Sequence, residues 1–313
     1  MWYNSNLHIH LFNEQIVFRG CRDTASGHAL RGYLLLSLRG INKITSIQLS
    51  LQGVASVPSE TTEIFLQHNV EFLEVTQNPK SFHSGTYMYH FELPLTGDLP
   101  ESVNSRNGCI QYSLKAVAKR EGFSLQSELL HERSVYISRV HSIDFDDINS
   151  QELLKFGEIH GELGFTIYSN SNSYQPGQEV NLNIGTKLLN TTSKIESIQA
   201  CIVEAVRYRT KNGDIKSTKR PLIETIKYED LRKYKPTVHS NSIQILIDSS
   251  IQTDCKSDML SLSHLIEIQI CLLNGSGMKK YILVRTPIHI SNKEEDTLPL
   301  YSLSTPTSPP AYT

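Results

Sequence analysis

"KITSIQLSLQG", residues 43–53, alternates mostly apolar and polar residues and ends on a glycine. Its apolar positions include Ile44, Ile47, Leu49 and Leu51. A period of two places such side chains on one face of a β-strand. The first six residues, KITSIQ, recur 151 positions later as KIESIQ, residues 194–199. We interpret this repeat as the trace of a duplicated β-sandwich.

The segments before the two copies share a second pattern. "SGHALRGYLLLSL" (26–38) and "PGQEVNLNIGTKL" (176–188) each place a glycine before alternating apolar residues. Further alternation occurs in "GTYMYHFELPL" (85–95) and "CIQYSLKAVAKR" (109–120). Many short strands bounded by Gly, Pro, Asn or Ser predict an all-β protein of the sandwich class. Helical periodicity is weak and confined to two windows, residues 150–156 and 224–234.

Composition limits the possible functions. The chain has 313 residues, 39% of them hydrophobic and 20% charged, which is typical of a globular protein. A net charge of −2 gives no global reason to bind nucleic acid. No apolar run reaches the roughly 18–20 residues of a membrane span, and no signal peptide is visible. The five cysteines are scattered and never form a CxxC pair, which favours free thiols in a cytoplasmic protein.

Composition also places the domain boundaries. Residues 1–145 form one predicted sandwich and residues 157–292 form the second. The acidic stretch at 146–156 interrupts the alternation and is the expected linker. Residues 293–313 are charged and then rich in Pro, Ser and Thr, so they bury too little apolar surface to fold. We expect a disordered tail there.

The ordered set of motifs resembles the α-arrestin family, also called arrestin-related trafficking adaptors or arrestin domain-containing proteins. In the first half the resemblance rests on "KITSIQLSLQG", "SFHSGTYMYHFELPL", "LPESV" and "GCIQYSLKAVAKR". In the second half it rests on "YQPGQEVNLNI", "SKIESIQACIVEAVRY", "LIEIQICLLNG" and "TPIHI". The resemblance covers nearly the whole chain.

The resemblance implies two tandem arrestin-type β-sandwiches, immunoglobulin-like in architecture, followed by a tail with PPxY motifs. It implies no enzymatic activity, no catalytic residue and no cofactor. It implies an adaptor that bridges the cytosolic tails of membrane transporters or receptors to a HECT-type ubiquitin ligase with WW domains. Such an adaptor is cytoplasmic, is recruited to the plasma membrane and endosomes, and promotes endocytosis and endosomal sorting. The alternative is an arrestin-fold sorting subunit of retromer-like type, which acts without a ubiquitin ligase.

The tail carries the predicted WW-binding sites. Proline-rich sequence is preformed as polyproline II, so little conformational entropy remains to be lost when a WW domain binds it. The first site, a PPxY motif, consists of Pro309, Pro310 and Tyr312. An LPxY variant lies upstream and consists of Leu298, Pro299 and Tyr301. Two residues followed by proline are candidate phosphorylation sites, Thr305 and Ser308.

A basic hairpin is predicted at residues 207–220, with a type I′ turn at Asn212-Gly213. This face could bind acidic cargo tails or an anionic membrane surface. It could equally be a solvated edge that lysines protect from strand pairing. The basic residues are Arg207, Arg209, Lys211, Lys216, Lys219 and Arg220.

Two further features give weaker expectations. His8 and His10 alternate on a predicted strand and therefore share a face, but no third ligand for a metal ion suggests itself. Lys115 and Lys119 are candidate ubiquitin acceptors by position alone. No hydrolase, protease or phosphate-binding motif occurs, and no metal site is expected.

Overall fold

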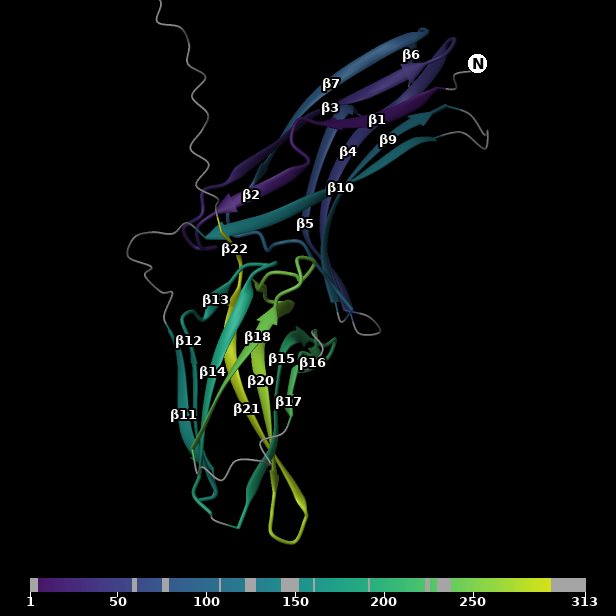
Figure 1. The fold of residues 1–313 in the computed structure, drawn as a ribbon. Helices are drawn as coiled ribbons and strands as arrows, with labels where there is room; N and C mark the ends of the chain where they lie inside the picture. The colour runs from purple at the N-terminus through teal and green to yellow at the C-terminus, as the bar shows by residue number, and fades with distance from the viewer. Residues whose placement is uncertain are drawn as a thin grey trace, which may run out of the picture.

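A computed structural model shows an elongated, all-β molecule of two lobes joined end to end (Figure 1). No helix occurs among the described residues, so none there could cross a membrane. The predicted WW-binding and phosphorylation residues, from Leu298 to Tyr312, lie outside the described part. The description covers residues 5–57, 61–74, 79–106, 108–121, 128–141, 152–159, 161–190, 192–222, 226–229 and 238–293.

The first domain stacks a small sheet on a large one. The small sheet has the order β1-β3-β7, and the large sheet follows β2-β10-β9-β4-β5, with β6 and β8 attached at its margins. The strands are β1 (Asn6–Leu11), β2 (Gln15–Arg19), β3 (His28–Leu38), β4 (Asn42–Val57), β5 (Thr61–Leu73), β6 (Lys80–Phe82), β7 (Gly85–Leu95), β8 (Val103–Ser105), β9 (Gly108–Arg120) and β10 (Glu128–His141).

The second domain repeats this arrangement. Its smaller sheet has the order β11-β12-β14-β18, and its larger sheet follows β13-β21-β20-β15-β16, with β17 and β19 at the margins. The strands are β11 (Leu153–Ile159), β12 (Leu163–Ser169), β13 (Ser173–Tyr174), β14 (Glu179–Leu188), β15 (Lys194–Arg209), β16 (Ile215–Pro221), β17 (Ile226–Glu229), β18 (Val238–Leu246), β19 (Cys255–Lys256), β20 (Leu260–Leu273) and β21 (Lys279–Ile290). The strand that follows, β22 (Asn292–Lys293), joins the large sheet of the first domain.

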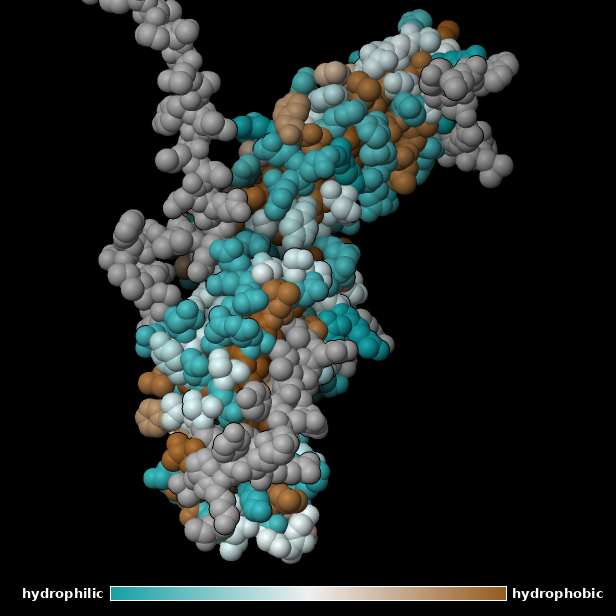
Figure 2. Space-filling view, viewed as in Figure 1, coloured by the Kyte–Doolittle hydropathy of each residue, from teal (hydrophilic) through white to brown (hydrophobic). Residues whose placement is uncertain are grey.

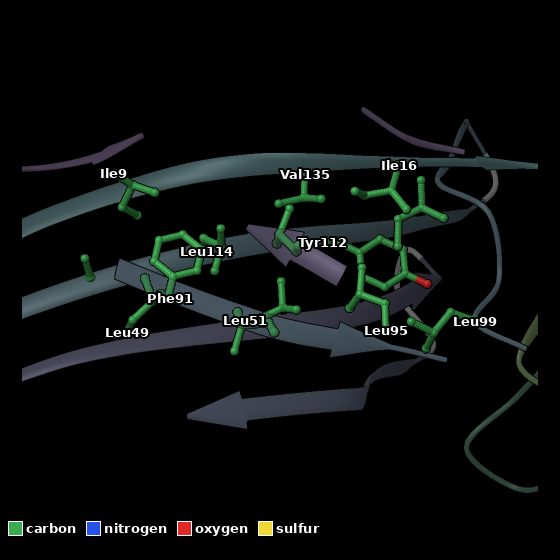
Figure 3. Packing of buried hydrophobic residues seen from close by; sticks show 14 of the residues in the cluster. Ile9, Ile16, Leu49, Leu51, Phe91, Leu95, Leu99, Tyr112, Leu114 and Val135 are labelled. Atoms are coloured by element: carbon green, nitrogen blue, oxygen red, sulfur yellow. The ribbon is translucent and has the colours of Figure 1, made fainter. Parts of the chain in front are cut away.

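Alternation along each strand builds the core. Ile44, Ile47, Leu49 and Leu51 on β4 are all at most 1% exposed, as the sequence predicts. Figure 3 shows Leu49 and Leu51 beside Phe91 of the opposite sheet. Burying one such aliphatic side chain stabilises the fold by about 1.5–3 kcal/mol, so the alternating strands supply most of the driving force for pairing the sheets.

The sequence repeat occupies the same place in both domains. KITSIQ lies in β4 and KIESIQ lies in β15, each inside the larger sheet. A bulge interrupts the pairing of β4 with β9 between Ile44 and Ser46, and another interrupts β15 with β20 between Ile195 and Ser197. The two bulges lie 151 residues apart, as the two hexapeptides do. The shared irregularity supports the interpretation of a duplicated domain.

Two sequence-based expectations need correction. Residues 153–156, expected to be linker and weakly helical, belong to β11, where Leu153 is buried and Phe156 faces solvent. Residues 226–229, inside the other weakly helical window, form strand β17 against β15. Both segments are short, and pairing with a neighbouring strand overrides their weak helical preference.

The C-terminal boundary also differs from the expectation. Lys293, assigned to the tail, belongs to β22, which pairs in parallel with Val140 and His141 of β10. The last strand of the second domain is therefore followed by a short strand in the sheet of the first domain. Sequence periodicity gives no signal for a strand of two residues.

Glycine 32 on β3 is a position where the packing permits no side chain. A Cβ there would lie 2.1 Å from the carbonyl oxygen of His10 on β1, whereas a Cβ at Gly85 on β7 would meet nothing within 4 Å. We expect Gly32→Ala to lower the free energy of unfolding by about 1–3 kcal/mol, as overpacking does. Urea unfolding measures this, with Gly85→Ala as the control. Equal stability of the two variants would contradict the close approach of β1 to β3.

Candidate functional site: the domain junction and its basic hairpin

Arg139 on β10 is a buried cation at the end of the first domain and is only 4% exposed. Its Nε donates to Glu101 Oε1 at 2.9 Å. Its Nη1 donates to the carbonyl of Gly20 at 3.1 Å, and its Nη2 to those of Gly97 at 2.8 Å and Leu99 at 3.0 Å. The guanidinium also lies over the ring of Phe18, 5.3 Å from its centroid. One side chain therefore holds the loop after β2 and the segment between β7 and β8.

The same segment contacts the second domain. The thiol of Cys255 donates to the carbonyl of Glu101 at 3.9 Å, and burial is the largest of the effects that raise the pKa of this thiol. Asn104 N donates to Gln252 Oε1 at 3.3 Å, and Ser105 Oγ donates to Glu204 Oε1 at 2.8 Å. These contacts join residues more than 90 positions apart in the sequence.

Apolar packing makes the junction continuous. Val206, Cys255, Leu260 and Leu262 of the second domain belong to the hydrophobic core of the first domain. A Cβ on Gly108 of β9 would lie 2.3 Å from Leu260 Cδ1, so the glycine leaves room for that leucine. The two domains therefore share core at their ends, which fixes one against the other more firmly than polar contacts alone.

The carboxylate of Asp254 anchors the loop before β19 to the second domain. This loop also holds Gln252, which contacts the first domain. Asp254 accepts from His264 Nδ1 at 2.6 Å and from His289 Nδ1 at 2.9 Å, and its own N donates to the carbonyl of Ile290 at 2.7 Å. Burial alone would raise the pKa of Asp254, but the two imidazole hydrogen bonds lower it. The hydrogen bond to Asp254 raises the pKa of His289. The loop that touches the first domain is thus fixed to β20 and β21.

A cavity of about 720 Å³ lies between the domains beside this loop. Arg22 crosses it: its Nε donates to the carbonyl of Asp98 at 2.7 Å and its Nη1 to that of Lys256 at 2.6 Å. The lining carries Asp23, Asp98, Glu101 and Asp254 as well as Arg22, Arg139, Arg207 and Lys256. Because His289 also lines the cavity and charges of both signs surround it, the lining does not favour a ligand of one sign.

The basic hairpin forms between β15 and β16, but its residues divide between two faces. Arg207 is opposite Ser217, and Lys219 is opposite Ala205, so Arg207, Arg209 and Lys219 share the outer face. Lys216 and Arg220 lie on the other face, where Arg220 Nη2 is 3.8 Å from Glu204 Oε1. Lys211 is in the turn.

The turn differs from the predicted type I′. Gly213 N donates to the carbonyl of Thr210, and Thr210 N donates to that of Asp214. Gly213 has a φ of 86°. This pattern is that of a three-residue loop with a bulged glycine after a type I turn. The hairpin is as predicted, but the turn accommodates one residue more.

The histidine pair gains a partner that the sequence did not reveal. His8 and His10 are 4.6 Å apart between ring centroids, and His131 of β10 lies 4.1 Å from His8. Nδ1 of His131 accepts a hydrogen bond from Ile9 N at 3.3 Å, so this ring nitrogen satisfies a backbone N–H at the edge of β1. Among the described residues, no three potential ligands are arranged to hold a metal ion. Arg133, which pairs with a glutamate, donates to the carbonyl of Ile9 at 3.3 Å.

Removal of the buried cation tests the junction. Arg139→Met leaves the Glu101 carboxylate unpaired and three carbonyls without their donor. We expect the free energy of unfolding to fall by about 3–5 kcal/mol. Urea unfolding of this variant is compared with that of Arg31→Met, which removes the exposed pair between Arg31 and Glu92 and should change stability little. Similar effects of the two variants would show that Arg139 does not organise the junction.

Acid should weaken the attachment of β1. Burial lowers the pKa of His8 and His131, and neighbouring imidazoles and Arg133 lower it further. The folded state therefore favours neutral rings, and their contribution to stability is lost as pH falls below 6.5, the ordinary pKa of a histidine side chain.

Urea unfolding from pH 7.5 down to about 5.5 measures this effect, because imidazoles titrate in that range. In His131→Gln the amide oxygen still accepts from Ile9 but does not titrate, so the pH dependence should be shallower. His289, whose pKa is raised, contributes with the opposite sign in both proteins. If the free energy of unfolding depended on pH in the same way in the wild type and in His131→Gln, the role of His131 would be contradicted.

Family models match both halves of the chain. The model for the N-terminal domain of arrestin (or S-antigen) matches residues 25–143, and that for the C-terminal domain matches residues 160–294. "Arrestin domain-containing protein C31A2.12" of Schizosaccharomyces pombe is 22% identical over 298 residues. That alignment covers 88% of this chain and 49% of the yeast protein, so the chain spans about half the length of this relative. The two matched domains, the two β-sandwiches and the likeness to this protein show that the chain belongs to the arrestin family and is α-arrestin-like.

Proposed function

We propose that the chain is a non-enzymatic trafficking adaptor that recruits a HECT-type ubiquitin ligase to membrane cargo. The observation that carries the proposal is the Ser308-Pro309-Pro310-Ala311-Tyr312 sequence behind a pair of arrestin domains. Cargo held by the domains and a ligase held by the tail would be close together, so ubiquitin transfer would occur at high effective concentration. The mark would direct transporters or receptors to endocytosis and endosomal sorting.

The chemistry of the tail supports this role. Pro309 and Pro310 present an apolar ridge to the aromatic groove of a WW domain, and Tyr312 adds a large ring with a polar tip. The tail begins after Lys293 in β22, beside the end of β10. Pro309 comes sixteen positions after Lys293, and a chain of that length spans at most about 53–58 Å. A ligase bound to the motif would therefore be tethered to the chain at the domain junction.

The outer face of the basic hairpin supports a contact with an anionic partner. Among the described residues, Arg207, Arg209 and Lys219 form no ion pair, and all three are exposed. Arg207 also lines the cavity between the domains. Cations on one face at strand spacing suit an acidic cytosolic tail or an anionic membrane surface. Either contact would bring this cytoplasmic adaptor to the plasma membrane or endosomes.

Substitution of the tail tyrosine tests the proposal. Tyr312→Ala removes the anchor of the PPxY motif, and we expect binding to a ligase fragment with all its WW domains to weaken about 30-fold, as for an aromatic hot spot. Fluorescence titration of the full chain measures the dissociation constant. Tyr301→Ala, in the LPxY variant, is the matched control and should weaken binding less. Unchanged affinity of Tyr312→Ala would contradict recruitment through this motif and favour a sorting subunit that works without a ligase.

A further inference from the structure

Two glycines face outward from the smaller sheet of the second domain. Gly164 lies on β12 and Gly185 in the interior of β14. Thr166 is opposite Gly185, and Gly164 is opposite Lys187, so the two glycines are diagonal neighbours on one face of the sheet. Glycine weakens a strand because it loses more conformational freedom on folding and offers no side chain to pack.

The fold itself does not require glycine at these two positions. A Cβ at Gly185 would come no closer than 3.7 Å to Thr166, and one at Gly164 no closer than 3.8 Å to Lys187, which are ordinary contacts. Neither residue has a positive φ. By contrast, a Cβ at Gly157 on β11 would lie 3.0 Å from the ring of Phe165. A strand glycine that internal packing does not need marks a place where something outside approaches closely.

Apolar side chains surround the two glycines. Phe156 is 75% exposed, Val238 is 58% exposed and Leu189 is 39% exposed. With the glycines they line a hollow of about 560 Å³, which we call the glycine hollow. Figure 2 shows apolar side chains along the margin of the second domain where Figure 1 places β11. Exposed apolar groups gathered around a depression indicate a contact surface more than single exposed residues do.

Two opposite charges flank the glycine hollow. Glu158 on β11 is opposite Gly164 on β12, and Gly164 is opposite Lys187 on β14. The two charges are therefore separated by one strand, which has no side chain at this position. The backbone spacing between them is about 9–10 Å, or two strand separations. Among the described residues neither forms an ion pair. A ligand that crosses this site can therefore offer a cation to Glu158 and an anion to Lys187.

We propose that the glycine hollow receives an apolar side chain of an extended peptide segment from a partner protein. In an extended chain, side chains on one face repeat about every 6.6–7 Å. A large apolar residue flanked by a basic and an acidic residue would therefore place its side chain on the glycine floor and direct the two charges toward Glu158 and Lys187. A bilayer fits less well because the floor is recessed and the site carries a carboxylate as well as an ammonium group. The site lies on the second domain, uses no residue of the tail, and does not depend on the proposed function.

The test places a side chain on Gly185, which forms part of the floor of the glycine hollow. Gly185→Val adds an outward, strand-favouring side chain that has room in the free protein. Asn181→Val is the matched control, because it faces the same way on the same strand, four residues away, and does not line the glycine hollow. A phage-displayed library of 12-residue peptides is selected on the full wild-type chain. We expect peptides with one large apolar residue between charges of opposite sign, with affinity at least 10-fold weaker for Gly185→Val and unchanged for Asn181→Val.

Stability and alternative occupants complete the test. The melting temperature of Gly185→Val should match or exceed that of the wild type, so a loss of peptide binding cannot be attributed to unfolding. Three outcomes would overturn the proposal. The first is a selection that yields no peptide sensitive to Gly185→Val. The second is sedimentation with phosphatidylcholine–phosphatidylserine vesicles that the variant abolishes, which would assign the face to lipid. The third is a wild-type dimer in analytical ultracentrifugation that the variant dissociates, which would assign it to a second copy.

Discussion

The buried guanidinium of Arg139 is the constraint on which the junction between the domains depends. A cation at this depth is tolerated only where hydrogen bonds replace its lost hydration. Here one carboxylate and three backbone carbonyls do so. Those acceptors belong to segments that have no regular structure of their own. The charge at the end of β10 therefore gives fixed positions to the loops that touch the second domain.

Strand β10 changes its neighbours along its length, and this change creates the junction. Its first part pairs with β9 as far as Val135. Its last part pairs in parallel with β2, and finally with β22. Between these partners, Ser102 N donates to the carbonyl of Ile137. The end of β10 thus contacts three separate segments of the chain, which are β2, the segment at Ser102, and β22. The last of these leads into the tail. The tail that we propose to bind a ligase starts at this end, so a ligase held there would be near both domains.

The exposed faces of the two domains differ in the contacts that they allow. On the first domain, His131 and Arg133 hydrogen-bond to the backbone of Ile9 and cover the second edge of β1 with side chains. An edge protected in this way is less open to pairing with a foreign strand. On the second domain, a row of exposed cations and a hollow floored by glycine face solvent. The first domain thus restricts contacts at this edge, whereas the second presents two surfaces of distinct chemistry.

The sequence by itself determined the class, the two domains and the core. Alternation is a local property, so Ile44, Ile47, Leu49 and Leu51 could be assigned to the core without knowledge of any partner strand. The PPxY motif is likewise local, because an extended peptide carries its own recognition elements. Neither required a tertiary structure.

Only the tertiary structure decided which distant residues meet. Arg139 with Glu101, His131 with Ile9, and β22 with β10 are separated by 38 to more than 150 positions, and no periodicity encodes such pairs. The faces of the basic hairpin followed from its register, which placed three of six cations together. In the sequence, Gly185 takes an ordinary outward position of the alternating strand and gives no sign of a role. Its meaning depends on the neighbouring strands, because among the described residues a Cβ there would meet only ordinary contacts with Thr166.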